Sequence, residues 1–314
     1  MVDTLMACPV CDNAAVEPFA TAVDMEYRTS DQDWQYVRCP RCTAVYLHEP
    51  PADRLSEIYP PNYYSYGGIA ESTTVTERVK EWLDGRMLRA ALKRIPGEKV
   101  RVLDVGGGAG WLLTAVRKVD DRVVETHEVD LQEDAQAAAE EAGHVYHRMP
   151  IEEFRSEEKF DLILMMSIIE HVADPRAVLD SMRDLLSDDG IVLLKTPNTE
   201  TLDCRLFRHR NWGGFHCPRH FVLFTERGLT DLGAECGLEV VTSSYTQGAP
   251  QWAISVMGWL HDKGWITVTP DRPAYRHPVY EPLTALFAAV DFVRARFART
   301  AQMVVSFRRA GVRR

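Results

Sequence analysis

A glycine-rich segment in the middle of the chain limits the fold more than any other feature. Residues 102–112 read Val-Leu-Asp-Val-Gly-Gly-Gly-Ala-Gly-Trp-Leu, which is typical of a buried strand, a tight turn and the start of a helix. Glycine lets the backbone approach a ligand closely, because it has no side chain to hold the ligand away. Strands that end in this way bind a nucleotide-like cofactor through backbone N–H groups. The segment therefore predicts a cofactor-binding α/β sheet.

An acidic residue follows at the spacing that such a cofactor requires. Asp130 lies twenty positions after Gly110, at the end of a second apolar segment. A carboxylate at this place accepts hydrogen bonds from ribose hydroxyls. Glu128 lies one alternation away on the same segment and could compete for the role.

From residue 100 onward, apolar and amphipathic segments alternate. Such alternation implies right-handed crossovers and a parallel sheet that is covered on both faces. We predict strands at 100–105, 123–129, 144–148, 160–166, 190–196, 238–246 and 302–307, and helices at about 110–118, 132–142, 175–186 and 226–236.

Two Cys-x-x-Cys pairs stand near the start of the chain. Cys8 and Cys11 form the first pair, Cys39 and Cys42 form the second, and 27 residues separate the two pairs. Four thiolates arranged in this way surround one ion tetrahedrally, and all-thiolate sites favour zinc. Disulfide bonds are a weaker interpretation in a reducing compartment, and so is a redox centre, because there are two copies. We expect one structural Zn²⁺.

The chain divides into five predicted parts. Composition changes at each boundary, with a Pro- and Tyr-rich stretch after the second cysteine pair and a Trp-rich stretch before the last strand. The parts are a zinc ribbon at 1–48, a linker at 49–71, a cofactor-binding core at 72–250, a helical insertion over the substrate cleft at 251–298, and a final strand with a basic tail at 299–314.

Composition excludes several classes of protein. The 314 residues are 46% hydrophobic and 26% charged, which is ordinary for a folded protein. The formal charge of −10 argues against a protein that binds the phosphate backbone of nucleic acids. No signal segment and no apolar run of spanning length is visible, so we expect a cytoplasmic enzyme. The basic and Trp-rich region 251–314 leaves weak contact with a membrane surface open.

Several motifs together resemble one enzyme family. The glycine segment, with Asp104 two residues before Gly106, is similar to the first motif of class I S-adenosylmethionine (SAM) methyltransferases. Residues 165–175, Met-Met-Ser-Ile-Ile-Glu-His-Val-Ala-Asp-Pro, resemble a segment of the UbiE/UbiG-like members, and Thr-Pro-Asn at 196–198 resembles another. Trp212 and the run Pro-Arg-His-Phe-Val-Leu-Phe-Thr at 218–225 resemble a signature of bacterial methyltransferases that also carry a zinc ribbon, often in polysaccharide, sugar or natural-product pathways.

The resemblance implies a Rossmann-like, seven-stranded sheet whose last strand lies antiparallel between the fifth and sixth. It also implies a set of site residues. His171 and His220 are the candidates for a general base, since the pKa of histidine lies near neutrality. For the cofactor SAM we expect Asp104, Gly106, Gly108, Gly110, Asp130, Leu131, Pro150, Ile151, Met165, Met166 and Ser167; for the substrate we expect Tyr63, Tyr64, Trp212 and Arg219.

Two departures from the family pattern restrict the mechanism. Quinone-type members of the family carry a pattern similar to Glu-x-x-Glu-His at this position, and its acids and histidine can hold a divalent metal. This chain has Ser167 at the first acidic position. Only Glu170 and His171 remain, which puts metal-assisted methylation in doubt. Sugar C-methyltransferases with a zinc ribbon usually carry a further C-terminal domain, which this chain is too short to hold.

The sequence therefore predicts SAM-dependent methylation of a small molecule, on oxygen or carbon, with a sugar or polyketide-like compound as the acceptor. An rRNA or tRNA methyltransferase with a zinc knuckle remains an alternative, and salt-sensitive RNA binding would support it. A non-catalytic SAM-binding protein is a second alternative, which the intact loop and the nearby histidines disfavour. The oligomeric state is not determined by the sequence.

Overall fold

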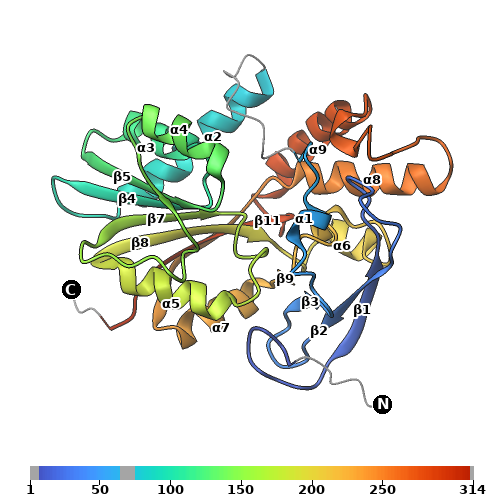
Figure 1. Cartoon of the computed structure of the whole chain (residues 1–314), viewed down its shortest axis with the longest axis horizontal. Helices are drawn as coiled ribbons and strands as arrows, with labels where there is room; N and C mark the ends of the chain where they lie inside the picture. The colour runs from blue at the N-terminus through green and yellow to red at the C-terminus, as the bar shows by residue number, and fades with distance from the viewer. Residues whose placement is uncertain (1–6, 64–74, 312–314) are drawn as a thin grey trace.

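The computed structural model describes residues 7–63 and 75–311, except for the side chains of residues 75–80. Two sheets organise this part of the chain, a large one in the core and a small one beside it (Figure 1). The large sheet has seven strands and the small one has four.

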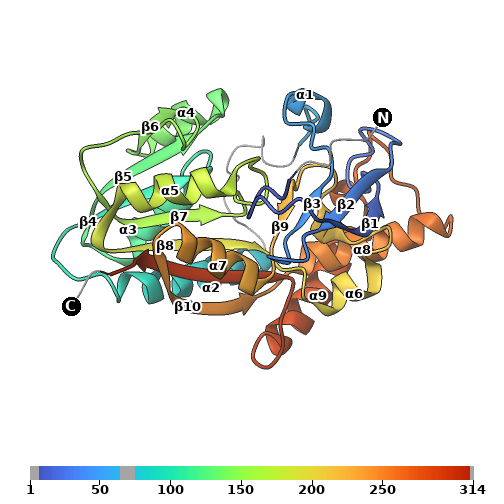
Figure 2. The same ribbon diagram turned by 90° about the horizontal axis from the view of Figure 1, so that it is seen from below.

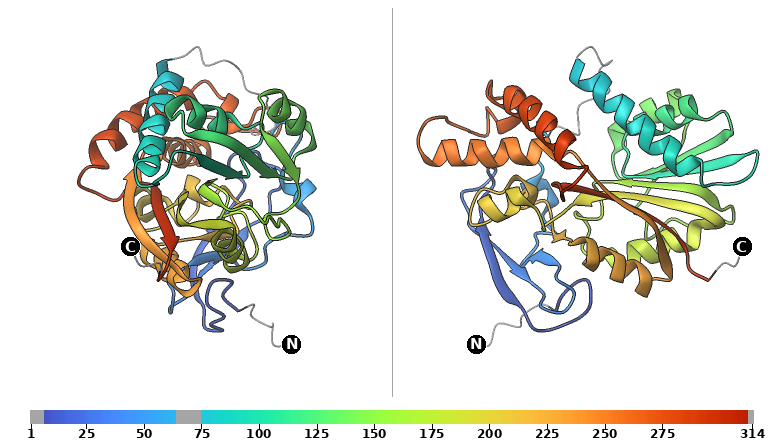
Figure 3. Two further views of the ribbon diagram at one scale, coloured as in Figure 1. Left: turned by 90° about the vertical axis from the view of Figure 1, so that its left-hand side faces the viewer. Right: turned by 180° about the vertical axis from the view of Figure 1, so that it is seen from behind.

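The large sheet has the predicted order. Six strands run in one direction, and β11 (Gln302–Arg309) lies antiparallel to them, between β8 (Leu186–Pro197) and β10 (Leu238–Thr246). Figure 3 shows β11 in dark red beside β10 in orange. The order β10-β11-β8-β7-β4-β5-β6 confirms the predicted Rossmann-like sheet. The remaining strands are β4 (Val100–Val105), β5 (Val123–Asp130), β6 (Val145–Arg148) and β7 (Phe160–Met166).

Helices cover both faces of this sheet. Figure 1 shows α2, α3 and α4 on one face, and α5 and α7 on the other. The start of α5 is set by Asp174, whose side chain accepts a hydrogen bond from the N–H of Ala177 at 3.0 Å and caps the first turn. The helices are α2 (Val75–Leu92), α3 (Trp111–Val119), α4 (Glu133–Glu141), α5 (Pro175–Leu185) and α7 (Glu226–Glu235).

The small sheet joins the start of the chain to the core. Its first three strands are β1 (Glu17–Ala22), β2 (Trp34–Arg38) and β3 (Val45–Leu47). Its fourth strand, β9 (Val222–Leu223), comes from the core and pairs antiparallel with β3. The only described helix in the Pro- and Tyr-rich stretch up to residue 63 is the short α1 (Leu55–Ile58).

The region before the last strand is helical. It contains α8 (Ala249–Asp262) and α9 (Tyr280–Arg294), whose side chains Trp252 and Phe287 stack at 4.9 Å between ring centroids. Figure 2 shows α8 and α9 beside the small sheet, together with α6 (Leu202–Phe207). Met25 of the N-terminal region packs in one apolar cluster with residues of α8. Among the described helices, none combines the length and the apolar composition needed to cross a bilayer.

Candidate active site

The glycine loop follows β4 and is tied to the end of β5. Gly106, Gly108 and Gly110 have φ angles of +75°, +61° and +74°, a region that side chains rarely adopt. The N–H of Gly107 donates to Glu128 Oε1 at 2.7 Å, and the N–H of Gly108 donates to Asp130 Oδ2 at 2.8 Å. Two carboxylates therefore fix the path of the loop.

Three carboxyl groups meet under this loop. Asp104 is 1% exposed, and burial together with the charge of Asp130 raises its pKa to about 7. Burial also raises the pKa of Glu128. Asp104 Oδ2 and Glu128 Oε2 are buried without a hydrogen-bond partner among the described residues. Buried acceptors of this kind need donors, and the ammonium group and ribose hydroxyls of SAM are donors of the right chemistry.

The other predicted cofactor residues differ in their exposure. Leu131 is 62% exposed, Pro150 is partly exposed, and Ile151 is buried next to it. Ser167, at a φ of +60°, follows β7, and Met166 before it is partly exposed. Met165 is a correction: its side chain is fully buried in the main core cluster, so it packs the sheet and cannot line a cofactor surface.

The two predicted histidines lie together beyond β7 and β8. The rings of His171 and His220 are 4.6 Å apart between centroids. Nδ1 of His171 lies 3.0 Å from the carbonyl oxygen of Arg219, and Nδ1 of His220 lies 2.8 Å from that of Gly214. A carbonyl only accepts, so each Nδ1 carries the proton and each Nε2 is left as the basic nitrogen.

Burial keeps both imidazoles neutral. It lowers the pKa of His171 to about 3 and that of His220 well below its usual value; the proximity of His216 adds to the lowering in both, and that of His171 adds to the lowering in His220. Beside them, burial raises the pKa of Glu170 to about 8. Thr196 Oγ1 donates to Glu170 Oε2 at 2.9 Å, whereas Oε1 has no hydrogen-bond partner among the described residues.

Glu170, His171 and His220 can also hold a cation. One ligand atom from each lies within 4.8 Å of the other two. In the sequence, His220 lies about fifty positions after Glu170 and His171, and only the fold brings it close to them.

Glu26, Tyr59 and His216, which the sequence analysis did not single out, join His171, His220 and the predicted Tyr63 in one wall of the site. His216 Nδ1 bonds to Glu26 Oε1 at 2.8 Å, and the hydroxyl of Tyr63 lies 3.1 Å from His216 Nε2. Tyr59, from the end of α1, places its hydroxyl 3.0 Å from His171 Nδ1. The many histidines and tyrosines in these segments were the sequence feature from which this cluster could have been predicted. Nothing in the sequence marks Glu26 as the partner of His216, which lies 190 residues away.

Two predicted substrate residues have structural roles instead. Arg219 is fully buried and pairs with Asp24 at 3.0 Å, so its charge is already compensated within the protein. Trp212 is 2% exposed, and its Nε1–H donates to Asp203 at 2.7 Å. Both predictions of substrate contact are therefore wrong. Tyr63 is 7% exposed and lies in the wall, while Tyr64 falls outside the described residues.

The four N-terminal cysteines converge as expected for a metal site. Their Sγ atoms all lie within 4.8 Å of one another, and the closest pairs, Cys8–Cys42 and Cys11–Cys39, are 3.5 and 3.6 Å apart. Ligands about 2.3 Å from a tetrahedral zinc lie about 3.8 Å from each other. None of these cysteines forms a disulfide. The arrangement therefore fits Zn²⁺.

We expect one Zn²⁺ per chain. Elemental analysis of freshly purified protein should return one equivalent, and Cys39→Ser should lower both the zinc content and the midpoint of thermal unfolding, because a structural metal contributes directly to folding. Cys204→Ser, at a buried cysteine far from the cluster, is the control. Full folding of wild-type protein that contains no zinc would contradict the assignment.

The buried histidines should make the protein sensitive to acid. The unfolded chain binds a proton at His171 below about pH 6.5, but the folded protein does so only near pH 3, so the free energy of unfolding should fall as the pH decreases from about 7 to about 4. His171→Gln should reduce this dependence in urea titrations at about pH 7 and pH 5. His209→Gln, at an exposed histidine, should leave this pH dependence unchanged. Equal pH dependence in all three proteins would contradict the argument.

Comparisons with known proteins agree with this geometry. The model of a family described as a methyltransferase domain matches residues 75–243. A ubiquinone biosynthesis O-methyltransferase from Parvibaculum lavamentivorans is 29% identical over 187 residues, which cover 55% of this chain and 71% of that protein. One from Dinoroseobacter shibae is 31% identical over 51% of this chain and 69% of its own length, and one from Actinobacillus pleuropneumoniae is 36% identical over 31% and 46%.

Solved structures show the same fold. A proposed sarcosine dimethylglycine methyltransferase from Galdieria sulphuraria superimposes with a TM-score of 0.50 at 15% identity, over 75% of this chain and 86% of that one. The chain spans less than half the length of several curated relatives that it matches. The family match covers more than half of the chain, and the sheet order and the glycine loop agree with it. The chain therefore belongs to the methyltransferase domain family and is a class I SAM-dependent methyltransferase.

Proposed function

We propose that the protein transfers the methyl group of SAM to oxygen or to an activated carbon of a small-molecule acceptor. The observation that supports this most is the pair of neutral imidazoles beyond the carboxyl ends of β7 and β8. The glycine loop follows the carboxyl end of β4, which is the neighbour of β7 in the sheet. In open α/β sheets, ligands bind outside the carboxyl ends of the strands. Cofactor and histidines therefore share one edge.

SAM supplies an electrophilic methyl group when it is bound, and the chain supplies alignment and proton transfer. Asp104, Glu128 and Asp130 would hold the polar groups of the cofactor. The acceptor would enter between His171, the segment 213–221 and the helical region 251–298. Holding donor and acceptor in line replaces a bimolecular encounter with a step inside one complex.

His171 is the better of the two candidate bases. It is partly exposed, whereas His220 is only 7% exposed. Its unprotonated Nε2 can take the acceptor's proton while the new bond forms, and Arg219 and Tyr59 fix the ring through Nδ1. A base of lowered pKa is sufficient when the acceptor becomes strongly acidic as it is methylated. We therefore favour a phenolic or sugar hydroxyl, or a carbon beside a carbonyl.

The relatives and the charge support a small molecule over RNA. The curated relatives are described as O-methyltransferases of ubiquinone biosynthesis, which supports methylation on oxygen. A net charge of −10 is unfavourable for phosphate backbones. In the N-terminal region, Asp24 and Glu26 are paired with Arg219 and His216 of the core.

SAM binding tests the cofactor site. The wild-type protein should bind SAM with a Kd in the micromolar range, about −8 kcal/mol. Gly106→Val is a poor probe, because a Cβ there would lie 2.5 Å from Ile168 Cδ1 and would strain the fold itself. Asp130→Asn should weaken binding by about tenfold, because ribose loses a charged acceptor. Asp188→Asn, at an exposed position of β8, is the control. Calorimetry that detects NAD binding but no SAM binding would contradict the assignment.

Methyl transfer tests the base. Labelled SAM should pass its methyl group to a compound in a protein-free, nuclease-treated metabolite extract. With that compound as substrate, His171→Ala should lower kcat by about 100- to 10,000-fold while SAM affinity is retained. The exposed His209→Ala is the matched control. Label that is transferred only to RNA, in a parallel extract without nuclease treatment, would contradict the proposal, and so would full turnover by both His171→Ala and His220→Ala.

A chelator separates the two roles of the cluster. If His171 acts as a base alone, EDTA that leaves the cysteine-bound zinc in place should not change kcat. If added divalent cations restore activity after EDTA, then Glu170, His171 and His220 hold a metal, and His171 is a ligand and not the base.

A further inference from the structure

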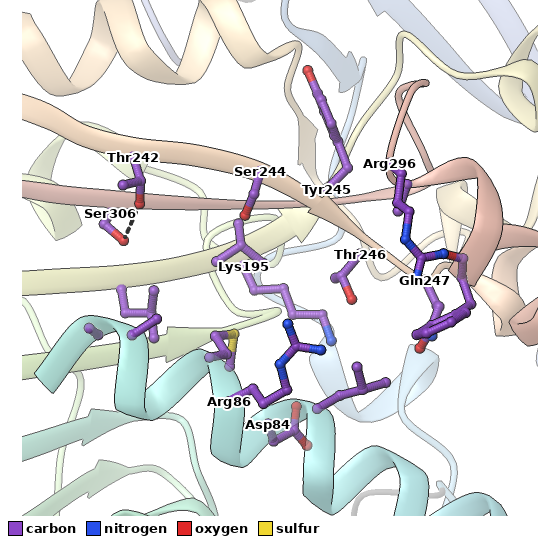
Figure 4. Close-up of a pocket in the computed structure, with 18 of the residues that line it drawn as sticks. Asp84, Arg86, Lys195, Thr242, Ser244, Tyr245, Thr246, Gln247, Arg296 and Ser306 are labelled. Atoms are coloured by element: carbon purple, nitrogen blue, oxygen red, sulfur yellow. Dashed lines mark hydrogen bonds between the residues drawn. The ribbon is translucent and has the colours of Figure 1, made fainter. Parts of the chain in front are cut away.

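A groove opens on the α2 face of the large sheet, away from the histidines. It lies between α2, the strands β8, β10 and β11, and the end of α9. Its volume is about 410 Å³, within the range of small-molecule binding sites. Figure 4 shows its polar lining. Nothing in the cofactor or histidine chemistry described above uses it.

The floor of the groove leads to the cofactor edge. Across the sheet, Ser244 pairs with Val304, Val304 with Lys195, and Lys195 with Met166. Residues paired in this way point to one face of a sheet, and neighbouring strands lie about 4.8 Å apart. Lys195 is therefore one strand away from Met166. Its carbonyl also accepts a hydrogen bond from the N–H of Ser167 at 2.8 Å.

The charged side chains that line the groove are mostly cationic. They are Arg86, Arg94, Lys195 and Arg296, with Asp84 as the one acidic group in the lining. In Figure 4 the side chains of Arg86 and Lys195 extend toward one another. Cations gathered in this way on a chain of net charge −10 repel each other, and an anion between them removes the repulsion.

The three arginines are not neutralised by the protein. None of them forms an ion pair with a carboxylate in the described part of the chain. Arg86 lies over the ring of Trp82 at 4.7 Å, and Arg296 lies over the ring of Phe292 at 4.5 Å. Arg94 donates to the carbonyl of Ala90. Each guanidinium group makes its contact with a partner that carries no negative charge, so the three positive charges are not compensated among the described residues.

Hydroxyl groups complete the lining. Thr242, Ser244, Thr246 and Ser306 come from β10 and β11, where a sheet face under a helix is usually apolar. Thr242 Oγ1 donates to Ser306 Oγ at 3.1 Å. One carboxylate needs one guanidinium fork. Three guanidinium groups, an ammonium group and four hydroxyls match an anion with more charge and more oxygens.

We propose that this groove binds a phosphate or diphosphate group of the methyl acceptor. The proposal rests on the function proposed above and names the class of acceptor, a phosphorylated small molecule. The acceptor would be anchored over β10 and β11 and would extend along the row through Lys195 and Met166 toward the cofactor.

Calorimetry with inorganic pyrophosphate tests the groove without the true acceptor. The wild-type chain should bind pyrophosphate, and Arg86→Gln and Arg296→Gln should each weaken binding by about tenfold, the usual effect of losing one charged hydrogen-bond donor. Arg89→Gln is the matched control, because Arg89 is an exposed arginine on α2 that does not line the groove. SAM affinity should be the same in all four proteins.

The outcomes separate the two proposals. Pyrophosphate binding that is absent, or equal in Arg86→Gln, Arg296→Gln and Arg89→Gln, overturns the anion site even if SAM binds. Absence of SAM binding overturns the proposed function whatever pyrophosphate does. Once an acceptor is known, removal of its phosphate should raise KM in the wild type and have little further effect in Arg86→Gln.

Discussion

Asp24 and Arg219 form an ion pair from which water is excluded, and the arrangement of the site depends on it. Both side chains are fully buried, with nitrogen–oxygen distances of 3.0 and 3.3 Å, and the guanidinium also lies 4.5 Å over the ring of Tyr27. Burial by itself would raise the pKa of Asp24, but the guanidinium of Arg219 holds it below its usual value. Removing one partner of such a pair leaves an uncompensated buried charge, which costs about 3–5 kcal/mol.

The pair fixes the loop that carries His220 and that contacts His171. The carbonyl of Arg219 orients His171, and His220 follows directly in the chain. The hydroxyl of Tyr36, on β2, lies 3.1 Å from the carbonyl of His220, which adds a second tie from the small sheet. The N-terminal sheet therefore forms part of the wall of the active site. In this account a metal held by the four cysteines stabilises that wall and takes no part in the chemistry.

Local patterns predicted the core well. The glycine loop and the alternation of strands and helices were expected, because each leaves a periodic or compositional signal over several residues. The antiparallel position of the last strand was implied by the family resemblance. The strand β9 was not expected, since Val222 and Leu223 are too short a segment to show any period and their pairing is decided by β3, far away in sequence.

The site was less predictable than the fold for the same physical reason. Sequence patterns identified His171 and His220 but not their environment, which comes from residues 24–26, 59–63 and 213–220 together. Arg219 and Trp212 carried side chains suited to a ligand, yet both satisfy buried carboxylates instead. Whether a polar residue serves a ligand or the fold depends on distant partners, and for Arg219 that partner, Asp24, lies 195 residues away.

A crystal structure of the protein with S-adenosylhomocysteine tests the central claim most directly. The account predicts that the ribose hydroxyls contact Asp130, that the adenine lies against Leu131 and Ile151, and that the sulfur points toward His171 and His220. A sulfur directed away from the two histidines, or a cofactor bound at another edge of the sheet, would contradict it.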